Sequence, residues 1–105
     1  MKEIGIRVDM GKYLHELRLS HGYSLKKVAD YLNIDISLLS KIEHGERHLQ
    51  RRMLQGIADI FKLDHRELQI KFLNERIEEE FGDEPYLIES LTIYLNGKEK
   101  RRIKI

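Results

Sequence analysis

The sequence predicts an all-α protein, and three observations lead to this class. Apolar residues recur at three- and four-residue spacing along most of the chain, and Gly or Asn residues separate these runs. Strand-like alternation is confined to a very short window at residues 4–8. The chain has 105 residues, of which 41% are hydrophobic, so it can bury one modest core.

The first expected helix begins after an N-terminal arm of residues 1–9. Within the arm, residues 4–8 are compatible with either a short terminal strand or a frayed end. Asp9 is a suitable N-cap for a helix that starts at Met10 and carries Leu14 and Leu17 on one face. Gly22 is expected to end this helix.

Two short helices with a three-residue connection are expected next. Ser24 is the N-cap candidate of the first helix, and Asp35 is that of the second. Between them, Asn33 tolerates the left-handed backbone conformation that a tight turn requires. Ala29 is small enough to let the two helices cross closely, and Gly45 ends the second helix. The second helix is expected to bury a stripe of apolar residues: Leu38, Leu39 and Ile42.

Three further helices are expected after a loop at residues 46–50. The fourth helix carries an apolar stripe made of Leu54, Ile57, Ala58 and Phe61. Asp64 caps the fifth helix, which runs through Phe81 and ends at Gly82. Asp83 is expected to cap the sixth, with Pro85 in its first turn and Asn96-Gly97 at its end.

Charge is distributed unevenly along the chain, although the net charge is only +1. Residues 1–63 contain 11 basic residues (Lys or Arg) and 8 acidic residues (Asp or Glu). Residues 64–89 contain 3 basic and 9 acidic residues, and residues 90–105 contain 5 basic residues and 1 acidic residue. This pattern fits a protein that attracts a polyanion on some surfaces and repels it on others, and it also fits helices that simply carry solvated charges.

Several classes of protein are excluded by what the sequence lacks. There is no cysteine, so disulfides and thiolate metal sites are ruled out. No stretch approaches the roughly 18 apolar residues of a membrane span, and the start at Met1-Lys2-Glu3 does not resemble a signal peptide, so we expect a cytoplasmic protein. His44 and His48 are separated by Gly45, and Ser20, His21 and Asp30 are not arranged as an activated nucleophile. We therefore expect no enzyme, no metal and no cofactor.

The segment from residue 14 to residue 63 resembles the lambda repressor and Cro family, also called XRE-like regulators. Three runs carry the resemblance: Leu14-His-Glu-Leu-Arg18, Gly22-Tyr-Ser-Leu with Val28-Ala29, and Leu38-Leu39-Ser40-Lys41-Ile42-Glu43-His44-Gly45-Glu46-Arg47. Leu54, Ile57, Ala58, Phe61 and Leu63 continue it. The resemblance implies a five-helix lambda repressor-like DNA-binding domain, to which this chain adds a C-terminal helix. It also implies a dimer that binds a partly palindromic operator.

The resemblance assigns roles to individual residues. The helix at residues 35–44 would enter the major groove of double-stranded DNA and present Ile36, Ser37, Ser40 and Lys41 to the bases. Phosphate contacts would come from Ser24, Lys26, Lys27, Arg47, His48, Arg51 and Arg52. Arg18 and Glu43 would form a partly buried ion pair between the first helix and the recognition helix.

The chain departs from the family pattern in three places. Leu25 stands where many members have a glutamine that contacts phosphate, and Leu49-Gln50 stands where Pro-Ser is frequent. Ile36 and Leu38 occupy positions in the recognition helix where polar residues are common. These differences affect the expected docking and base preference, and they leave the fold unaffected.

We expect residues 10–74 to form the DNA-binding domain and residues 75–105 to form a helical extension with a basic tail. The apolar residues of the last third either cover the core or build a dimer interface, and we favour the interface. The tail at residues 98–105 either follows phosphate or is disordered.

Two functions follow from the sequence. The first is a transcriptional regulator that binds operator DNA as a homodimer. The second is a protein-interaction module, such as an antitoxin or a restriction-modification controller, whose C-terminal helices bind a protein partner. Neither function involves a membrane.

Overall fold

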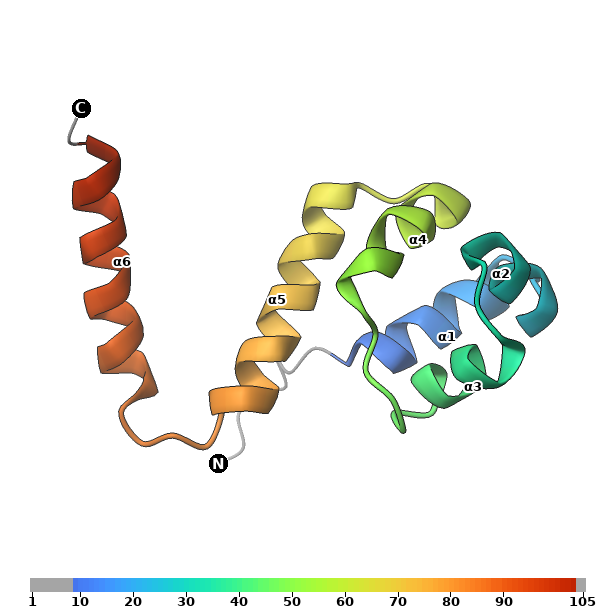
Figure 1. Cartoon of the computed structure of the whole chain (residues 1–105), viewed down its shortest axis with the longest axis horizontal. Coiled ribbons are helices and arrows are strands. Elements are labelled where there is room, and N and C mark those ends of the chain that lie inside the picture. Colours follow the sequence, from blue (N-terminus) through green and yellow to red (C-terminus); the bar gives the residue numbers. More distant parts are fainter. Residues whose placement is uncertain (1–8, 104–105) are drawn as a thin grey trace. The chain divides into compact units, whose positions relative to one another are not determined.

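The computed structural model describes residues 9–103, and every regular element within that range is a helix (Figure 1). The elements are α1 (Met10–Ser20), α2 (Leu25–Leu32), α3 (Ile36–Glu43), the 3-10 turn η1 (Arg51–Met53), α4 (Leu54–Phe61), α5 (His65–Phe81) and α6 (Leu87–Ile103). The expected all-α class is therefore confirmed. The strand considered at residues 4–8 lies outside the described residues.

Hydrogen bonds from backbone amides to capping side chains fix the starts of three helices at N-caps that the sequence predicts. Asp9 accepts from the Lys12 amide at 3.0 Å, and Ser24 accepts from the Lys27 amide at 3.0 Å. Asp64 accepts from the Arg66 amide at 2.8 Å. Asp35 occupies the N-cap position of α3, but its side chain makes no capping hydrogen bond.

The hydrophobic core is built from every element between α1 and α5. Its members are buried apolar side chains: Met10, Leu14, Val28, Ala29, Leu39, Ile42, Leu49, Met53, Leu54, Ile57, Ala58, Phe61, Leu68 and Phe72. Leu49, one of the departures from the family pattern, is thus a core residue. This core fixes α2 and α3 against α1 and α4.

The approach of α1 to α3 depends on a glycine. A Cβ atom added at Gly11 would collide with the carbonyl oxygen of Ile42, a backbone atom that no side-chain movement can displace. The sequence indicates Ala29 as the small residue of a close helix crossing, and Ala29 is indeed fully buried. The sequence alone does not indicate Gly11, because its role depends on a contact with a helix about 30 residues away.

Among residues 9–103, two non-glycine residues adopt the left-handed backbone conformation, and each ends a helix. Asn33 ends α2 with φ 59°, as the sequence predicted. Lys62 ends α4 with φ 55°, which the sequence did not indicate because lysine has no particular preference for this conformation.

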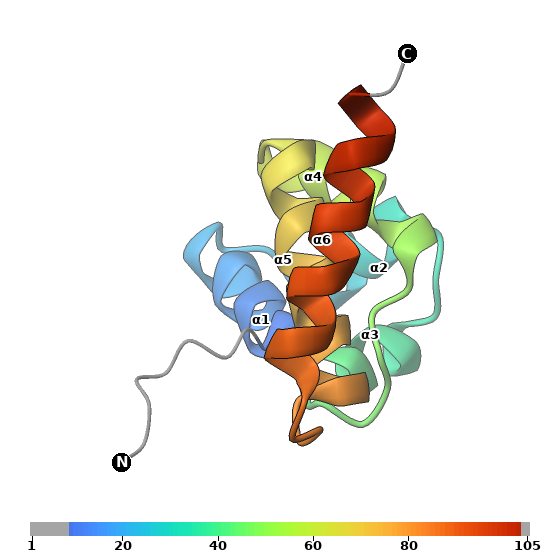
Figure 2. The same ribbon diagram turned by 90° about the vertical axis from the view of Figure 1, so that its left-hand side faces the viewer.

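The chain divides into two compact units after Glu75. The first unit contains α1 to α4 and the beginning of α5, and Figure 2 shows these helices from a second direction. The second unit contains the end of α5 and all of α6, which is a single continuous helix in both views (Figures 1 and 2).

Both predicted ends of the sixth helix are wrong. The helix begins at Leu87, so Asp83 is not its N-cap and Pro85 precedes it in a turn where the Leu87 amide donates to the Glu84 carbonyl at 3.3 Å. It continues through Asn96 and Gly97 to Ile103, so the basic tail is helical up to that residue. The Lys and Arg residues after Gly97 are good helix formers and favour a helix C-terminus electrostatically, which offsets the cost of about 1 kcal/mol for one internal glycine.

Candidate nucleic-acid interface

The helix pair α2–α3 is joined by a turn whose backbone hydrogen bonds are satisfied locally. The Asn33 amide donates to the Asp30 carbonyl at 3.1 Å, and the Ile34 amide donates to the Ala29 carbonyl at 3.0 Å. These bonds close the end of α2 and let the chain reverse within three residues. The next helix therefore begins at a fixed angle, with its own first turn at the molecular surface.

One side of α3 is buried and the opposite side faces solvent. Leu39 and Ile42 are 0% and 1% exposed, so they anchor the inner side in the core. Ser37, Lys41 and His44 are exposed on the outer side, and Ile36 is 44% exposed at its start. Ser40 is half-buried at the edge of this outer side. A short helix with a polar outer side and an apolar inner side has the form required to enter a DNA groove.

A charged network beneath α3 connects it to α1. Arg18 Nε donates to Glu43 Oε2 at 2.8 Å, and Arg18 Nη2 donates to Glu43 Oε1 at 3.0 Å. This two-point geometry is the strongest form of an arginine–carboxylate pair. Arg18 Nη1 also donates to the Tyr23 carbonyl at 3.0 Å, which extends the network to the start of α2. The pair that the family resemblance implied is formed, and the Arg18 side chain ties α1 to α3 and to the turn that precedes α2.

His15 joins the same network from the next turn of α1. Its Nδ1 donates to Glu43 Oε1 at 2.7 Å. Burial alone would raise the pKa of the Glu43 carboxyl, but hydrogen bonds from Arg18 and His15, together with their charges, lower the pKa below its ordinary value of 4.5. Glu43 is therefore ionised and locked in place at the end of α3.

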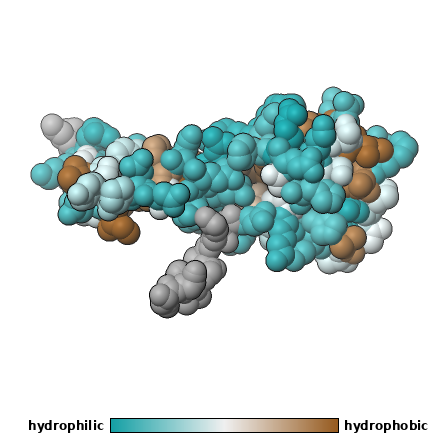
Figure 3. Space-filling model, turned by 90° about the horizontal axis from the view of Figure 1, so that it is seen from below, coloured by the Kyte–Doolittle hydropathy of each residue, from teal (hydrophilic) through white to brown (hydrophobic). Residues whose placement is uncertain are grey.

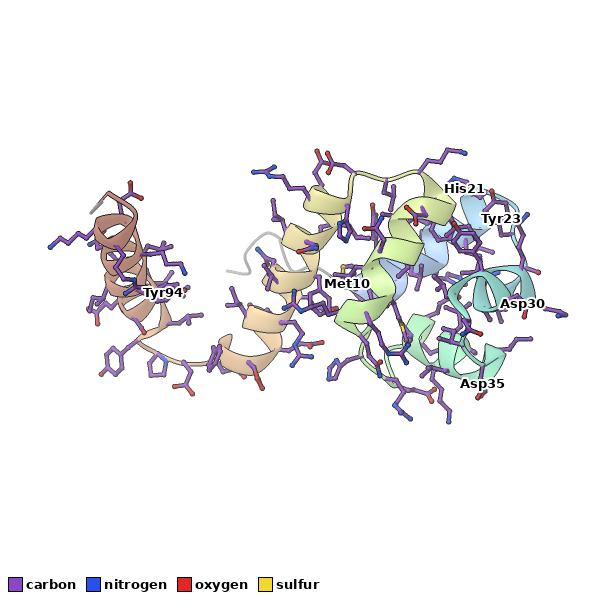
Figure 4. The ribbon with its side chains drawn as sticks, turned by 45° about the horizontal axis from the view of Figure 1, so that its top comes forward. Met10, His21, Tyr23, Asp30, Asp35 and Tyr94 are labelled. Atoms are coloured by element: carbon purple, nitrogen blue, oxygen red, sulfur yellow. The ribbon has the colours of Figure 1, made fainter. Side chains whose placement is uncertain are left out.

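The two lysines of α2 contact neighbouring side chains. Lys26 Nζ lies 2.8 Å from Asp30 Oδ2, and Lys27 Nζ lies 4.4 Å from the centre of the Tyr23 ring. His21 packs beside Tyr23 with ring centres 5.3 Å apart, as Figure 4 shows at the end of α1. The contacts of both lysines are at the surface, so an anionic partner can replace them at low cost.

The arginines near η1 are also positioned by contacts. The Arg51 guanidinium lies 5.3 Å from the centre of the Phe72 ring, and Arg52 Nε donates to Gln50 at 2.8 Å. Arg47 and His48 are exposed in the loop that follows α3. Acidic residues interrupt this basic surface, since Asp30 on α2 and Asp35 at the start of α3 are both exposed (Figure 4).

A family model described as helix-turn-helix matches residues 14–68, slightly more than half of the chain. The chain belongs to this helix-turn-helix family. The family is of the lambda repressor and XRE-like type, and the chain is accordingly a DNA-binding transcriptional regulator. Among curated proteins, none matches the sequence.

Solved structures support the helix-turn-helix fold. Two crystal structures of the clp gene regulator ClgR from Corynebacterium glutamicum are similar to this chain. The first has a TM-score of 0.53 at 20% identity and covers 68% of this chain and 92% of that one. The second has a TM-score of 0.54 at 16% identity and covers 97% of this chain and 93% of that one.

Two histidines of the helix-turn-helix segment belong to this site and were missed from the sequence. His15 lies three residues before Arg18, and that spacing on one helix face was the available signal. His44 is the C-cap of α3, and its Nδ1 donates to the Ser40 carbonyl at 2.7 Å. It lies one helical turn beyond Ser40 on the outer side of α3, so its imidazole belongs to the same exposed surface as Ser37 and Lys41.

No helix within the described part of the chain combines the length and apolarity needed to cross a lipid bilayer.

Proposed function

We propose that this protein is a sequence-specific regulator that binds a partly palindromic operator as a homodimer, with α3 in the major groove. The observation that carries the proposal is the two-sided character of α3. Leu39 and Ile42 fix its inner side, and Ser37 and Lys41 stand on its outer side. A side chain that reads bases must be held by a rigid element, and the Arg18–Glu43 pair supplies that rigidity.

Base contacts are assigned to the four residues on the outer side and leading edge of α3. Lys41 can donate to guanine O6 and N7, and Ser37 and Ser40 can donate or accept at base edges. Ile36 is exposed enough to contact a thymine methyl group. Because two of these residues are small hydroxyls, Lys41 is expected to make the largest contribution to sequence preference.

Phosphate contacts are assigned to the residues that flank α3 in space. The Ser24 hydroxyl oxygen accepts the capping bond from Lys27, so its proton is available to a phosphate oxygen. The remaining phosphate contacts come from cations: Lys26, Lys27, Arg47, His48, Arg51 and Arg52. Lys26 would exchange Asp30 for phosphate, which brings no net loss of ion pairs.

The test is fluorescence anisotropy with the DNA upstream of the protein's own gene and a scrambled duplex, over a salt series. We expect at least ~10³-fold tighter binding to the upstream DNA and a steep decrease of affinity with salt. Lys41→Ala should reduce the preference about tenfold or more, whereas Arg47→Ala should weaken both duplexes and reduce the salt slope by about 1.

Lys62→Ala is the matched control for lost charge, since Lys62 is an exposed cation at the C-cap of α4 and is not among the proposed DNA contacts. It should change neither the preference nor the salt slope appreciably. Equal binding of both duplexes at every salt concentration would contradict sequence-specific recognition.

A second candidate function is favoured by the surface of α6. Ile88, Ile93 and Leu95 are 77%, 73% and 59% exposed, which is unusual for large aliphatic side chains. Such a surface suits a protein-interaction module, for example an antitoxin or a restriction-modification controller. Co-purification of a neighbouring gene product with the full chain, lost when Ile88 and Leu95 are changed to Ser, would support it.

A further inference from the structure

The surface of α6 carries an apolar stripe. Leu87, Leu91 and Tyr94 follow one another at four- and three-residue spacing and therefore share one side of the helix. Ile88 and Leu95 extend this stripe along its edge. Both are more than half exposed, as is Tyr94, and Figure 3 shows apolar side chains at the surface of this unit.

This helix gains little stabilising burial from its own chain. No side chain described in α6 is buried. A helix of 17 residues is only marginally stable in water on its own, because most helical stability in proteins comes from packing an apolar face. The stripe is thus the surface on which a partner would lie.

Charge distinguishes between partners and between orientations. The segment at residues 83–89 contains Asp83, Glu84 and Glu89 and no basic residue. The segment at residues 98–104 contains five basic residues and one acidic residue. The first turn of α6, together with the turn before it, is acidic and the end of α6 is basic, so each complements the other end of an identical helix and repels its own equivalent.

We propose that α6 pairs antiparallel with α6 of a second copy of this chain, centred on Leu91. In this register Leu91 opposes its equivalent and Leu87 opposes Leu95 of the second copy. Glu84, in the turn that leads into α6, lies at the end that meets Lys98 of the second copy. A parallel pair would place the basic ends together and is disfavoured. This pairing adds an orientation and a register to the homodimer of the proposed function, and its biological role rests on that function.

Cysteine cross-linking in full-length protein without DNA tests the centre of the pair. The chain has no cysteine, so single-cysteine variants give unambiguous products. Leu91→Cys should form a disulfide-linked dimer under mild oxidation, because the two residues meet at the symmetry axis. Ile93→Cys is the matched control, since it lies on the opposite side of α6 and should remain monomeric on a denaturing gel.

A charge exchange tests the antiparallel orientation. Glu84→Lys and Lys98→Glu should each weaken the dimer about tenfold, as measured by sedimentation equilibrium, since each change places like charges together at two symmetric positions. The double variant with both changes should recover the wild-type dissociation constant. In a parallel pair, residue 84 would meet residue 84 and residue 98 would meet residue 98, so each single change would replace one like-charged pair with another and neither would weaken the dimer.

Four results would overturn the inference. They are a strict monomer at high concentration, equal cross-linking of both cysteine variants, a dimer unaffected by either charge change, and a double variant that stays weakened. Because these measurements contain no DNA, they are independent of operator binding. Specific DNA binding by a monomer would overturn this inference and the homodimer but would leave sequence-specific recognition by α3 intact. A stable α6-paired dimer without specific DNA binding would overturn the operator proposal alone.

Discussion

At the scale of single residues, the Arg18–Glu43 pair is the contact on which the orientation of α3 most depends. The Glu43 side chain is 2% exposed and the Arg18 side chain is 10% exposed, so neither charge can be fully hydrated if its partner is removed. We expect Arg18→Ala to lower the free energy of unfolding by about 3–5 kcal/mol, measured by urea denaturation.

The double variant Arg18→Met, Glu43→Leu is the informative control for this prediction. It removes both charges and replaces them with apolar groups, so it should recover most of the lost stability. Lys62→Ala, at an exposed position, should leave the midpoint unchanged. An unaltered urea midpoint in Arg18→Ala would show that the pair contributes little to the fold.

The same pair predicts how stability depends on pH. The pKa of Glu43 is lower in the folded protein than its ordinary value of 4.5, because the effect of burial, which raises the pKa, is outweighed by hydrogen bonds from Arg18 and His15. As the pH falls, Glu43 therefore binds a proton in the unfolded chain at a higher pH than it does in the folded chain. The contribution of this carboxylate is complete above pH 4.5 and is lost as the pH falls below that value.

Glu43→Gln provides the measurement. Its free energy of unfolding should be lower than that of the wild type at neutral pH and should decrease less steeply as the pH falls below 4.5. Urea denaturation across about pH 3 to 7 would compare the two slopes. Identical slopes would mean that another carboxyl group causes the acid sensitivity.

Residues that act through local backbone geometry were the easiest to predict from the sequence. Asp9, Ser24 and Asp64 cap helices, and Asn33 adopts the left-handed conformation, because these roles depend only on the residue and its immediate neighbours. His15 was missed because its role depends on Glu43, which lies 28 residues away in sequence. That contact can be placed only when the crossing of α1 and α3 is known.

At the scale of elements, Gly11 determines how closely α1 approaches α3. Gly11→Ala would place a Cβ atom against the Ile42 backbone, so the helices must separate and the core must loosen. We expect a loss of about 1–3 kcal/mol in the free energy of unfolding and weaker DNA binding, because α3 would be displaced.

Gly97→Ala is the matched control for this substitution. Gly97 lies within α6, and a Cβ atom added there would have no neighbour within 4 Å, so the new methyl group meets nothing. This variant should gain helix content and stability, by up to about 1 kcal/mol, as followed by circular dichroism. A Gly11→Ala protein as stable as the wild type would show that α1 and α3 adjust without cost.

The ends of α6 show where reasoning from local signals fails. The Asp83, Pro85 and Asn96-Gly97 signals suit a helix at residues 84–95, yet α6 covers Leu87–Ile103. Proline is favoured in the first turn of a helix, but it is also common in a turn that precedes a helix, as Pro85 does here. Gly97 ends a helix only when the residues beyond it gain nothing from continuing, and here five strong helix formers follow.

At the scale of the whole molecule, the chain consists of two units with unequal shares of buried surface. All the buried apolar side chains of the core belong to residues 10–72, which is why the periodicity of the first five helices predicted their packing well. The second unit has no buried residue among those described in α6, so the sequence within one chain could not define what covers it. What covers α6 depends on another chain in the assembly.

This division predicts the behaviour of a chain that ends at Gly82. Such a chain retains α1 to α5 and the entire apolar core, so it should unfold cooperatively. Its Tm should lie within about 6 °C of the Tm of the full chain measured at a concentration where the full chain is monomeric. Without α6 it should be monomeric in sedimentation equilibrium. Its affinity for the operator should fall by about 10²-fold, because a dimer binds both half-sites in one event whereas two monomers must bind the half-sites separately.

The two measurements on this shortened chain separate stability from assembly. A cooperative transition with reduced operator affinity is the expected result, and it would assign α6 to dimerisation. A chain that fails to unfold cooperatively would instead show that the core requires α6, in contradiction to the burial pattern. A folded monomer that binds the operator as tightly as the full chain would mean that one copy of α3 is sufficient for recognition.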